Sequence, residues 1–600
     1  MEPSSPWVMK IDAAQPICQE VLAQKYLRGT ERTPEDVFKR VARALASIEH
    51  PACRSMWESR FFRNLQTGAL LAGRIMAGAG SDSKTTLINC FVQPVGDSIL
   101  GQDEQGNPSI YQALQEAAET LRRGGGVGFD FSPLRPAGAL VHSTGSQASG
   151  PCSYIDVFDR SCATVQATGA RRGAQMAVLR IDHPDVMEFI RAKHQRDRWT
   201  HFNVSVAIPR EFFDVLKTDG WWLLRHRAEP SQAQRQHGAI VDGQGRWVYG
   251  RLRARDIWQR LMRSAYDYAE PGVLFTDTIA NDNNLRYREA IDATNPCGEQ
   301  PLPAYGACDL GPLVLSRFVR HPFGRVARSA LDWQALDACV QTQVRALDNA
   351  LDVTYWPLPQ QRAQALTTRR IGVGLTGLGD ALVMLGLRYD RPEGRDMARQ
   401  IAQFLRDSSY RASIALARER GCFAAFDCHH YLARGTFASR LPQDIQAQIR
   451  RWGIRNSHLL AIAPAASVSL AFADNVSSGI EPPFAWRHRR QVKRSDGALV
   501  SYEAHNHAFR LFQRYGGDPS HLPESFVQAL DIRPEHHVAM MQAVQPFIDG
   551  AISKTVPIAQ DMPFQEIEDL YLSAWSAGLK GLTLYRANPH VGAVWSPLNP

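Results

Sequence analysis

The sequence predicts a protein of the α/β class, built as one large domain with an appended piece or as several domains. Three features indicate this: helical periodicity in several segments, short apolar runs with the length of strands, and Gly- and Pro-rich loops between them. The length of 600 residues exceeds the usual range of a single domain. With 44% hydrophobic and 21% charged residues, the chain has the composition of an ordinary globular protein.

The N-terminal part is expected to contain two helices around one buried strand. Residues 1–30 look irregular. Residues 33–50 begin with a Thr cap, a Pro and two acidic residues, followed by apolar residues at helical spacing, which predicts an amphipathic helix. Residues 86–92 form an apolar run typical of a buried strand that contains Cys90, and a helix is expected over 110–123. Taken alone, Cys90 is best explained as packing in that strand.

The C-terminal half continues the mixture of helices and strands. Residues 221–269 indicate both types of element. Residues 343–353 and 397–420 have helical spacing, and Gly421 is expected to end the second helix. Residues 459–463 form a plausible buried strand that ends at a proline.

Three glycine-rich stretches could approach a ligand. Residues 124–128 allow close approach of either a ligand or another strand. Residues 168–176 place paired arginines between glycines, which without further context indicates an exposed turn. Residues 372–377 match the dinucleotide fingerprint G-x-G-x-x-G, but the preceding Thr-Thr-Arg-Arg at 367–370 is not an apolar strand. We therefore favour close helix packing over a nicotinamide site.

Composition narrows the function classes. Ten cysteines without any C-x-x-C motif argue against a disulfide scaffold and a zinc ribbon, and the Cys422, Cys428, His429 and His430 group has no standard zinc spacing, so no metal site is expected. The net charge of +8, mostly from Arg, suits anionic ligands but is spread along the chain, so nucleic-acid binding is not expected.

The sequence shows no targeting signal and no apolar run of membrane-spanning length, which predicts a cytoplasmic protein. The first residues lack the basic and apolar regions of a signal peptide. The most apolar long stretch, 371–387, contains several glycines and Asp380, so no membrane partner is expected.

Residues 293–303 contain the strongest candidates for reactive side chains in the sequence. Its prolines and glycine predict a tight, stiff loop, and the alternation of Asn295, Cys297 and Glu299 puts an amide, a thiol and a carboxyl group on one side of an extended backbone. Cys308 follows closely. These groups suit hydrogen-atom abstraction paired with acid–base chemistry. The residues alone also fit a proline-rich surface loop with a chance cysteine.

Residues 295–303 and 305–311 resemble the finger loop of ribonucleotide reductases, most closely the adenosylcobalamin-dependent class II enzymes. Segments that resemble other parts of the family occur in the same order between about residues 20 and 590. The resemblance implies a ten-stranded α/β barrel of two five-stranded halves with a central finger loop, plus an N-terminal helical region. The implied organisation is a mostly helical region over 1–80, the barrel over 81–575, and a tail over 576–600 that lacks the family's usual cysteine pair.

The resemblance also implies roles for five residues of the site. Cys297 corresponds to the thiyl radical, and Cys90 and Cys308 to the pair that supplies two reducing electrons. Glu299 corresponds to the base at the ribose 3′-hydroxyl, and Asn295 to the residue that orients the substrate. In the family, the thiyl removes the 3′-hydrogen and the 2′-hydroxyl leaves as water. Asp309 and Pro312 stand where the family usually has Asn and Ser.

Two further sites are implied by the same resemblance. Asp97 matches the acid that holds the ribose of the specificity effector, and Arg171, Arg172 and Gln175 match the loop that relays effector identity. The expected substrate phosphate seat is a turn that could open a helix with free backbone N–H groups. It consists of Ala465, Ala466, Ser467, Val468 and Ser469.

The implied partners are a ribonucleotide, with a diphosphate favoured over a triphosphate, a deoxynucleotide or ATP effector, and a second copy of the chain in a homodimer. The implied cofactor is adenosylcobalamin, because the segment 582–586 has a single tyrosine, Tyr585, where class I large subunits have a tandem pair. No cysteine follows Cys428, so a thioredoxin-type reductant or a separate cysteine-bearing chain is expected. No ATP-binding cone-like segment is recognised, so on/off control by ATP and dATP is not expected. A class I large subunit and a non-catalytic nucleotide-binding regulator remain as alternatives.

Overall fold

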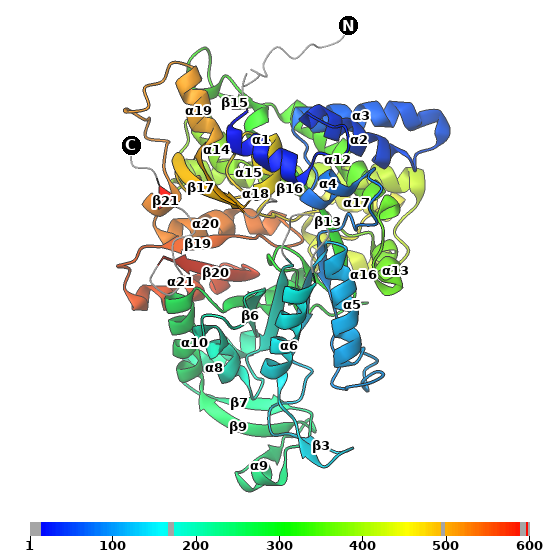
Figure 1. The fold of residues 1–600 in the computed structure, drawn as a ribbon, viewed down its shortest axis with the longest axis vertical. Helices are drawn as coiled ribbons and strands as arrows, with labels where there is room; N and C mark the ends of the chain where they lie inside the picture. Colours follow the sequence, from blue (N-terminus) through cyan, green and yellow to red (C-terminus); the bar gives the residue numbers. More distant parts are fainter. Residues whose placement is uncertain (1–13, 166–172, 494–497, 588–595, 598–600) are drawn as a thin grey trace.

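A nine-stranded sheet forms the centre of the fold (Figure 1). The computed structural model describes residues 14–165, 173–493, 498–587 and 596–597. In sheet order, the strands are β16 (Ile371–Thr376), β13 (Ala307–Val314), β1 (Cys90–Val92), β2 (Gly126–Asp130), β5 (Gln175–Arg180), β6 (Phe202–Ile208), β10 (Gly272–Phe275), β20 (Gly581–Arg586) and β19 (Thr555–Ile558).

Residues 458–462 join the two edges of this sheet. On one side they pair in parallel with β16, where the Val373 N–H donates to the Leu459 carbonyl at 2.7 Å. On the other side they pair in parallel with the chain just before β19, where the Ser553 N–H donates to the Ile462 carbonyl at 2.8 Å. The sheet therefore closes, and the expected ten-stranded α/β barrel is confirmed.

The barrel consists of two parallel halves. Strands β1, β2, β5, β6 and β10 are parallel to their neighbours, and so are β13, β16, the 458–462 segment, the 551–558 segment and β20. The halves meet in antiparallel pairs, β1 with β13 and β10 with β20. Since β20 ends at Arg586, the sheet extends beyond the boundary at 575 expected from the sequence.

Four N-terminal helices pack at one end of the barrel: α1 (Pro16–Lys25), α2 (Pro34–Ala46), α3 (Arg54–Thr67) and α4 (Gly73–Gly78). Helix α2 confirms the predicted helix, with a capping box between Thr33 and Asp36. The expectation of an irregular start is wrong for α1. Its buried residues Ile17, Cys18, Val21 and Leu22 form one apolar face that is stabilised by packing rather than by a strong local signal.

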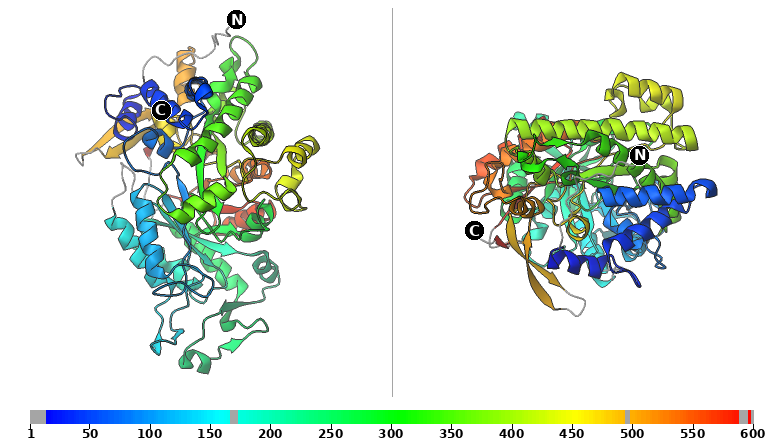
Figure 2. Two further views of the ribbon diagram at one scale, coloured as in Figure 1. Left: turned by 90° about the vertical axis from the view of Figure 1, so that its right-hand side faces the viewer. Right: turned by 90° about the horizontal axis from the view of Figure 1, so that it is seen from above.

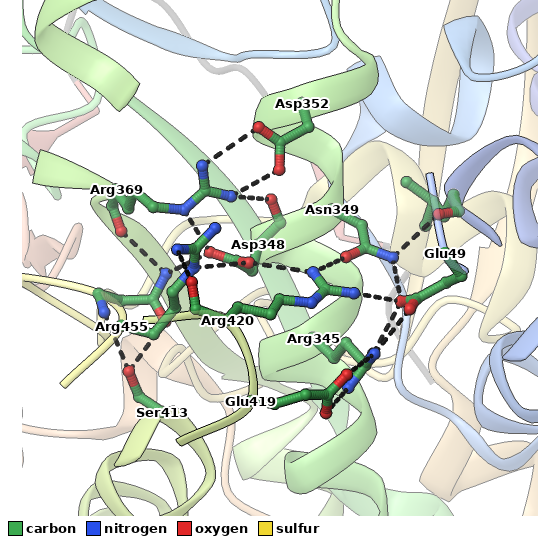
Figure 3. A network of polar contacts seen from close by, with 12 residues as sticks. Glu49, Arg345, Asp348, Asn349, Asp352, Arg369, Ser413, Glu419, Arg420 and Arg455 are labelled. Atoms are coloured by element: carbon green, nitrogen blue, oxygen red, sulfur yellow. Dashed lines mark hydrogen bonds and ion pairs between the residues drawn. The ribbon is translucent and has the colours of Figure 1, made fainter. Parts of the chain in front are cut away.

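A buried ion-pair network connects these helices to the barrel (Figure 3). Arg345 on α12 (Trp333–Val353) contacts Glu49 at 2.6 Å, and Arg369, just before β16, contacts Asp348 at 2.7 Å. Helix α12 begins ten residues before the predicted 343 because an Asp cap at 332 starts it. Helix α15 (Pro392–Arg420) supplies Glu419 and Arg420 to the same network and runs along one side of the molecule in the right-hand view of Figure 2.

The 372–377 motif lies in strand β16 and its end, so the expected close helix packing is wrong. A Cβ atom at Gly374 would lie 2.3 Å from the carbonyl oxygen of Ala461, and one at Gly372 would lie 2.9 Å from the Gln300 side chain. These glycines allow the closing segment and the finger loop to approach the barrel wall.

Further elements lie around the barrel. Helices α5 (Ile110–Arg122) and α6 (Pro151–Thr164) run beside it in Figure 1. The mixed segment predicted at 221–269 contains β7 (Trp221–His226), β9 (Trp247–Arg253) and α10 (Ala254–Tyr268). Within the described part of the chain, no helix combines the length and apolar character needed to cross a bilayer.

Candidate active site

The finger loop is a hairpin inside the barrel. Strands β11 (Ala293–Thr294) and β12 (Pro301–Leu302) pair in antiparallel fashion. A Cβ atom at Gly128 on β2 would lie 1.7 Å from the Thr294 carbonyl oxygen, so the hairpin backbone lies directly against this strand. From the other half of the barrel, the Ala551 N–H donates to the Glu299 carbonyl at 2.9 Å. The glycines at 124–128 thus admit another backbone segment, one of the two partners expected for them.

The tip of the hairpin is tightly turned, as the sequence predicts. The Gly298 N–H donates to the Asn295 carbonyl at 3.0 Å, and the Gln300 N–H donates to the Asn295 side chain at 2.9 Å. Gly298 has a φ of 80°, a conformation that suits glycine. Asn295 and Glu299 are each 2% exposed, so their polar groups lie in the interior.

Two thiols, an amide and a carboxyl group meet beneath this tip. Cys90 on β1 is the direct cross-strand partner of Cys308 on β13. The Asn295 amide donates to the Cys90 sulfur at 3.2 Å, and the Cys90 thiol donates to Glu299 Oε1 at 3.7 Å. Directly paired antiparallel residues have Cα atoms about 4.5–5.5 Å apart, within the range of disulfides. Both cysteines carry reduced thiols here, in a position to form one bond.

Burial controls the charge of this pair. Cys308 is fully buried, and desolvation followed by the nearby Asp309 raises the pKa of its thiol well above the ordinary value. The thiol is therefore protonated at neutral pH and carries a proton that it can give up. A buried thiol of this kind is a poor nucleophile and keeps its proton.

Cys297 lies between two cavities. It is partly buried and lines a cavity of about 410 Å³ together with Ser553, Thr555 and Tyr585. It also lines a second cavity of about 570 Å³ together with Glu299. Cys297 is therefore part of the wall of both cavities.

The second cavity is strongly basic. It is lined by Lys25 at the end of α1, Arg28, Arg74 on α4, and Arg490 on β17 (Arg487–Lys493), with Glu299 as its one acidic residue among the described lining. None of these four cations was predicted from the sequence. They come from distant segments, and only their convergence on one cavity distinguishes them from the other positive charges of the chain.

The predicted phosphate turn lies at the same cavity. Ala465, Ala466, Ser467 and Val468 line it at the start of α18 (Ala466–Phe472). The Tyr26 hydroxyl donates to Ser467 Oγ at 2.8 Å, which ties the turn to the N-terminal helices. Ser469 does not line the cavity in the described structure, and its hydroxyl lies 3.0 Å from that of Thr376 on β16.

The predicted effector residues lie elsewhere. The Asp97 carboxylate forms an ion pair with Arg135 at 2.9 Å. Gln175 is buried on β5, and its amide donates to the Phe158 carbonyl on α6 at 3.4 Å. Arg171 and Arg172 fall outside the described residues. Among these residues, the structure brings neither Asp97 nor Gln175 to the two cavities beside Cys297.

Within the described residues, no group of three or more His, Cys, Asp or Glu side chains is arranged to hold a metal ion. The group around Cys422 and Cys428 is included in this finding. Both of these cysteines are free thiols.

Comparisons with known proteins agree with this architecture. Residues 14–84 match the model "Ribonucleotide reductase, all-alpha domain", and residues 88–585 match "Ribonucleotide reductase, barrel domain". Over an alignment of 612 positions, the chain is 33% identical to the vitamin B12-dependent ribonucleoside-diphosphate reductase of Mycobacterium tuberculosis, covering 97% of this chain and 80% of the relative. It is 32% identical to the protein of the same name from Thermoplasma acidophilum, covering 83% of this chain and 61% of that relative. The chain belongs to the ribonucleotide reductase family.

Proposed function

We propose that this chain reduces ribonucleotides to 2′-deoxyribonucleotides with adenosylcobalamin as its cofactor. The observation that carries the proposal is the place of Cys297 between two cavities, one of which also holds Glu299 and a cluster of cations. The thiol pair for the reduction, Cys90 and Cys308, lies in direct cross-strand register beside Glu299. The names of the two relatives, both vitamin B12-dependent ribonucleoside-diphosphate reductases, favour the cofactor and a diphosphate substrate.

The smaller cavity has side chains that suit the adenosyl end of the cofactor. Hydroxyl groups of Ser553, Thr555, Thr583 and Tyr585 line it next to Cys297 and can bond ribose hydroxyls and adenine nitrogens. When bound, adenosylcobalamin supplies the one-electron chemistry that converts the Cys297 thiol to a thiyl radical. The protein's part is to present that thiol and to exclude water from it.

The larger cavity suits the substrate. Lys25, Arg28 and Arg490 can neutralise the phosphate charges, and the N–H groups at the start of α18 can bond phosphate oxygens. The sugar then lies between Cys297 and Glu299. Asn295, held by its bond to the Gln300 N–H, orients the reacting groups.

The reaction that follows is balanced by the residues present. The Cys297 thiyl removes the hydrogen from carbon 3′, and Glu299 accepts the 3′-hydroxyl proton. The 2′-hydroxyl leaves as water after protonation by the Cys90/Cys308 pair, for which the raised pKa of Cys308 keeps a proton available. The two thiols become a disulfide. One of their hydrogens completes the departing water and the other forms the new C–H bond at carbon 2′. Glu299 returns its proton to the 3′-oxygen, and Cys297 returns its hydrogen to carbon 3′.

The enzyme would also bind an allosteric effector and a protein that reduces its disulfide. Asp97 and the loop with Arg171, Arg172 and Gln175 would bind a deoxynucleotide or ATP effector across a homodimer. A thioredoxin-type protein or a separate cysteine-bearing chain would reduce the disulfide. The ion pair of Asp97 with Arg135 means that an effector ribose has to compete with this guanidinium.

The test is turnover of the purified chain with adenosylcobalamin, dithiothreitol and either CDP or CTP. Formation of dCDP or dCTP supports the proposal, and the faster substrate identifies the phosphate number. Absence of product that is restored by a second, radical-bearing protein would instead indicate a class I large subunit. Nucleotide binding without product under both conditions would indicate a regulator.

A further inference from the structure

Asn203 on β6 is hydrogen bonded to the finger loop beside the proposed radical residue. Its side-chain amide donates to the carbonyl of Pro296 at 2.8 Å, one residue before Cys297. Asn203 also lines the smaller cavity beside Cys297. Asn203 is the second residue of β6, and no pattern around it in the sequence indicated that it would reach the hairpin.

This bond is one of two that hold the tip from opposite halves of the barrel. The Pro296 carbonyl is bound by Asn203 from the half that contains β6, and the Glu299 carbonyl is bound by the Ala551 N–H from the other half. Only Cys297 and Gly298 lie between these two anchors. Gly298 adopts positive φ, and a Cβ atom added to it would meet no other atom within 4 Å, so the tip has room to move at that point.

The chemistry is sensitive to such movement. Hydrogen transfer requires the reacting atoms to approach within about 3–3.5 Å, and a displacement of about 1 Å can reduce the rate about 100-fold. The sulfur of Cys297 has to give up its hydrogen on the side of the smaller cavity and take one from a sugar carbon on the side of the larger one. A tip held on both sides of Cys297 can serve both, whereas loss of the Asn203 bond releases the Pro296 carbonyl from β6 and lets Cys297 shift away from one of them.

We propose that Asn203 is a positioning residue that fixes Cys297 between the two cavities through the Pro296 carbonyl. The inference rests on the proposed function for its catalytic consequence, but the anchoring itself is a property of the hairpin. Asn203 makes no contact with reacting atoms in this account and acts only through the backbone of residue 296.

The test compares the wild type with Asn203→Asp, which keeps the shape of the side chain but has no donor when ionised. We expect kcat to fall about 100-fold while KM for the nucleotide changes less than about threefold. The ratio of variant to wild-type kcat should rise as the pH is lowered from 8 to 5.5, since a protonated carboxyl group regains an O–H donor toward the Pro296 oxygen. A merely structural role would produce no such recovery.

A second measurement does not depend on turnover. In the Asn203→Asp protein at pH 8, alkylation of Cys297 by iodoacetamide, followed by mass spectrometry, should be at least about threefold faster or slower than in the wild type. If the wild type shows no turnover, the proposed function fails, and this labelling comparison still decides the anchoring.

The matched control is Asn475→Asp. Asn475 donates an equivalent bond to the His505 carbonyl at 2.9 Å, away from the hairpin. This control should keep kcat within about twofold and leave labelling of Cys297 unchanged. The inference is overturned if Asn203→Asp has wild-type kcat and labelling, if only KM changes, or if the kcat ratio does not vary with pH.

Discussion

Asp309 offers a prediction that can be worked out from its surroundings. This residue follows Cys308 on β13 and is fully buried, and neither carboxyl oxygen has a hydrogen-bond partner outside its own residue in the described structure. Burial, and then repulsion from Asp348, raise the pKa of the Asp309 carboxyl well above its usual range. Replacement by Asn keeps the size of the side chain and removes the ability to ionise.

The sign of the effect follows from proton linkage. Because the pKa is raised in the folded state, the folded protein holds this proton more tightly than the unfolded chain. The contribution of the Asp309 carboxyl to the free energy of unfolding is fully present below its pKa in the unfolded chain, about 4. It is lost as the pH rises toward its pKa in the folded protein. The loss is at most about 1.4 kcal/mol per pH unit, so between pH 5 and pH 7 Asp309→Asn should gain stability relative to the wild type, by up to about 3 kcal/mol.

Thermal unfolding at one scan rate is a suitable assay. The barrel-domain match spans residues 88–585. With an unfolding entropy of about 2.1 cal/mol/K per residue, this gain raises the Tm of Asp309→Asn relative to the wild type by up to about 3 °C between pH 5 and pH 7. The control is Asp348→Asn. Although burial opposes it, contact with Arg369, Arg455 and Arg420 lowers the pKa of Asp348, so this variant should become less stable relative to the wild type as the pH rises through the acid range. A Tm difference for Asp309→Asn that is equal at pH 5 and pH 7 would refute the reasoning.

Three further variants test the site. Gly128→Ala places a methyl group against the Thr294 carbonyl and should lower kcat at least about 100-fold with an unchanged circular dichroism spectrum, whereas an active variant would contradict the threaded hairpin. Cys308→Ser should bind nucleotide with wild-type affinity but form no deoxynucleotide when the enzyme is pre-reduced and no reductant is added; normal product would exclude this thiol as an electron source. Arg490→Ala should raise KM about tenfold with kcat nearly unchanged, because it loses about 1.4 kcal/mol of uniform binding. Arg489→Ala, an exposed neighbour on the same strand, is its control, and an equal effect of both would show a general charge effect instead.

The sequence predicted those elements whose signals are local. The capped helix α2 and the stop of α15 at Gly421 depend on neighbouring residues, and both are found. Helix α1 was missed because its apolar face is short and is stabilised by distant contacts, such as the bond from the Gln15 amide to the His505 carbonyl at 2.9 Å. The 372–377 stretch was misread because glycines that admit a neighbouring backbone look the same whether the neighbour is a helix or a strand.

The same limit applies to the site. The stiff loop with Asn295, Cys297 and Glu299 could be predicted from its proline and glycine content, and the cysteine partners from the family resemblance. The extended backbone expected from their alternation is wrong, because residues 296–299 form a turn closed by the bond from the Gly298 N–H to the Asn295 carbonyl. Asn203 and Arg490 could not be predicted. Asn203 reaches the finger loop only because the barrel closes around it, and Arg490 reaches the larger cavity on strand β17, so no pattern around either residue indicates its place. Residues that act from the wall of a barrel have no local sequence signal.

The most direct test of the central claim is a single turnover of pre-reduced enzyme with adenosylcobalamin and CDP in the absence of reductant. The account predicts one deoxynucleotide per active site, with the loss of two free thiols that mass spectrometry assigns to Cys90 and Cys308, and no product from Cys297→Ala. Product formed by Cys297→Ala, or formed by the wild type without the loss of those two thiols, would contradict it.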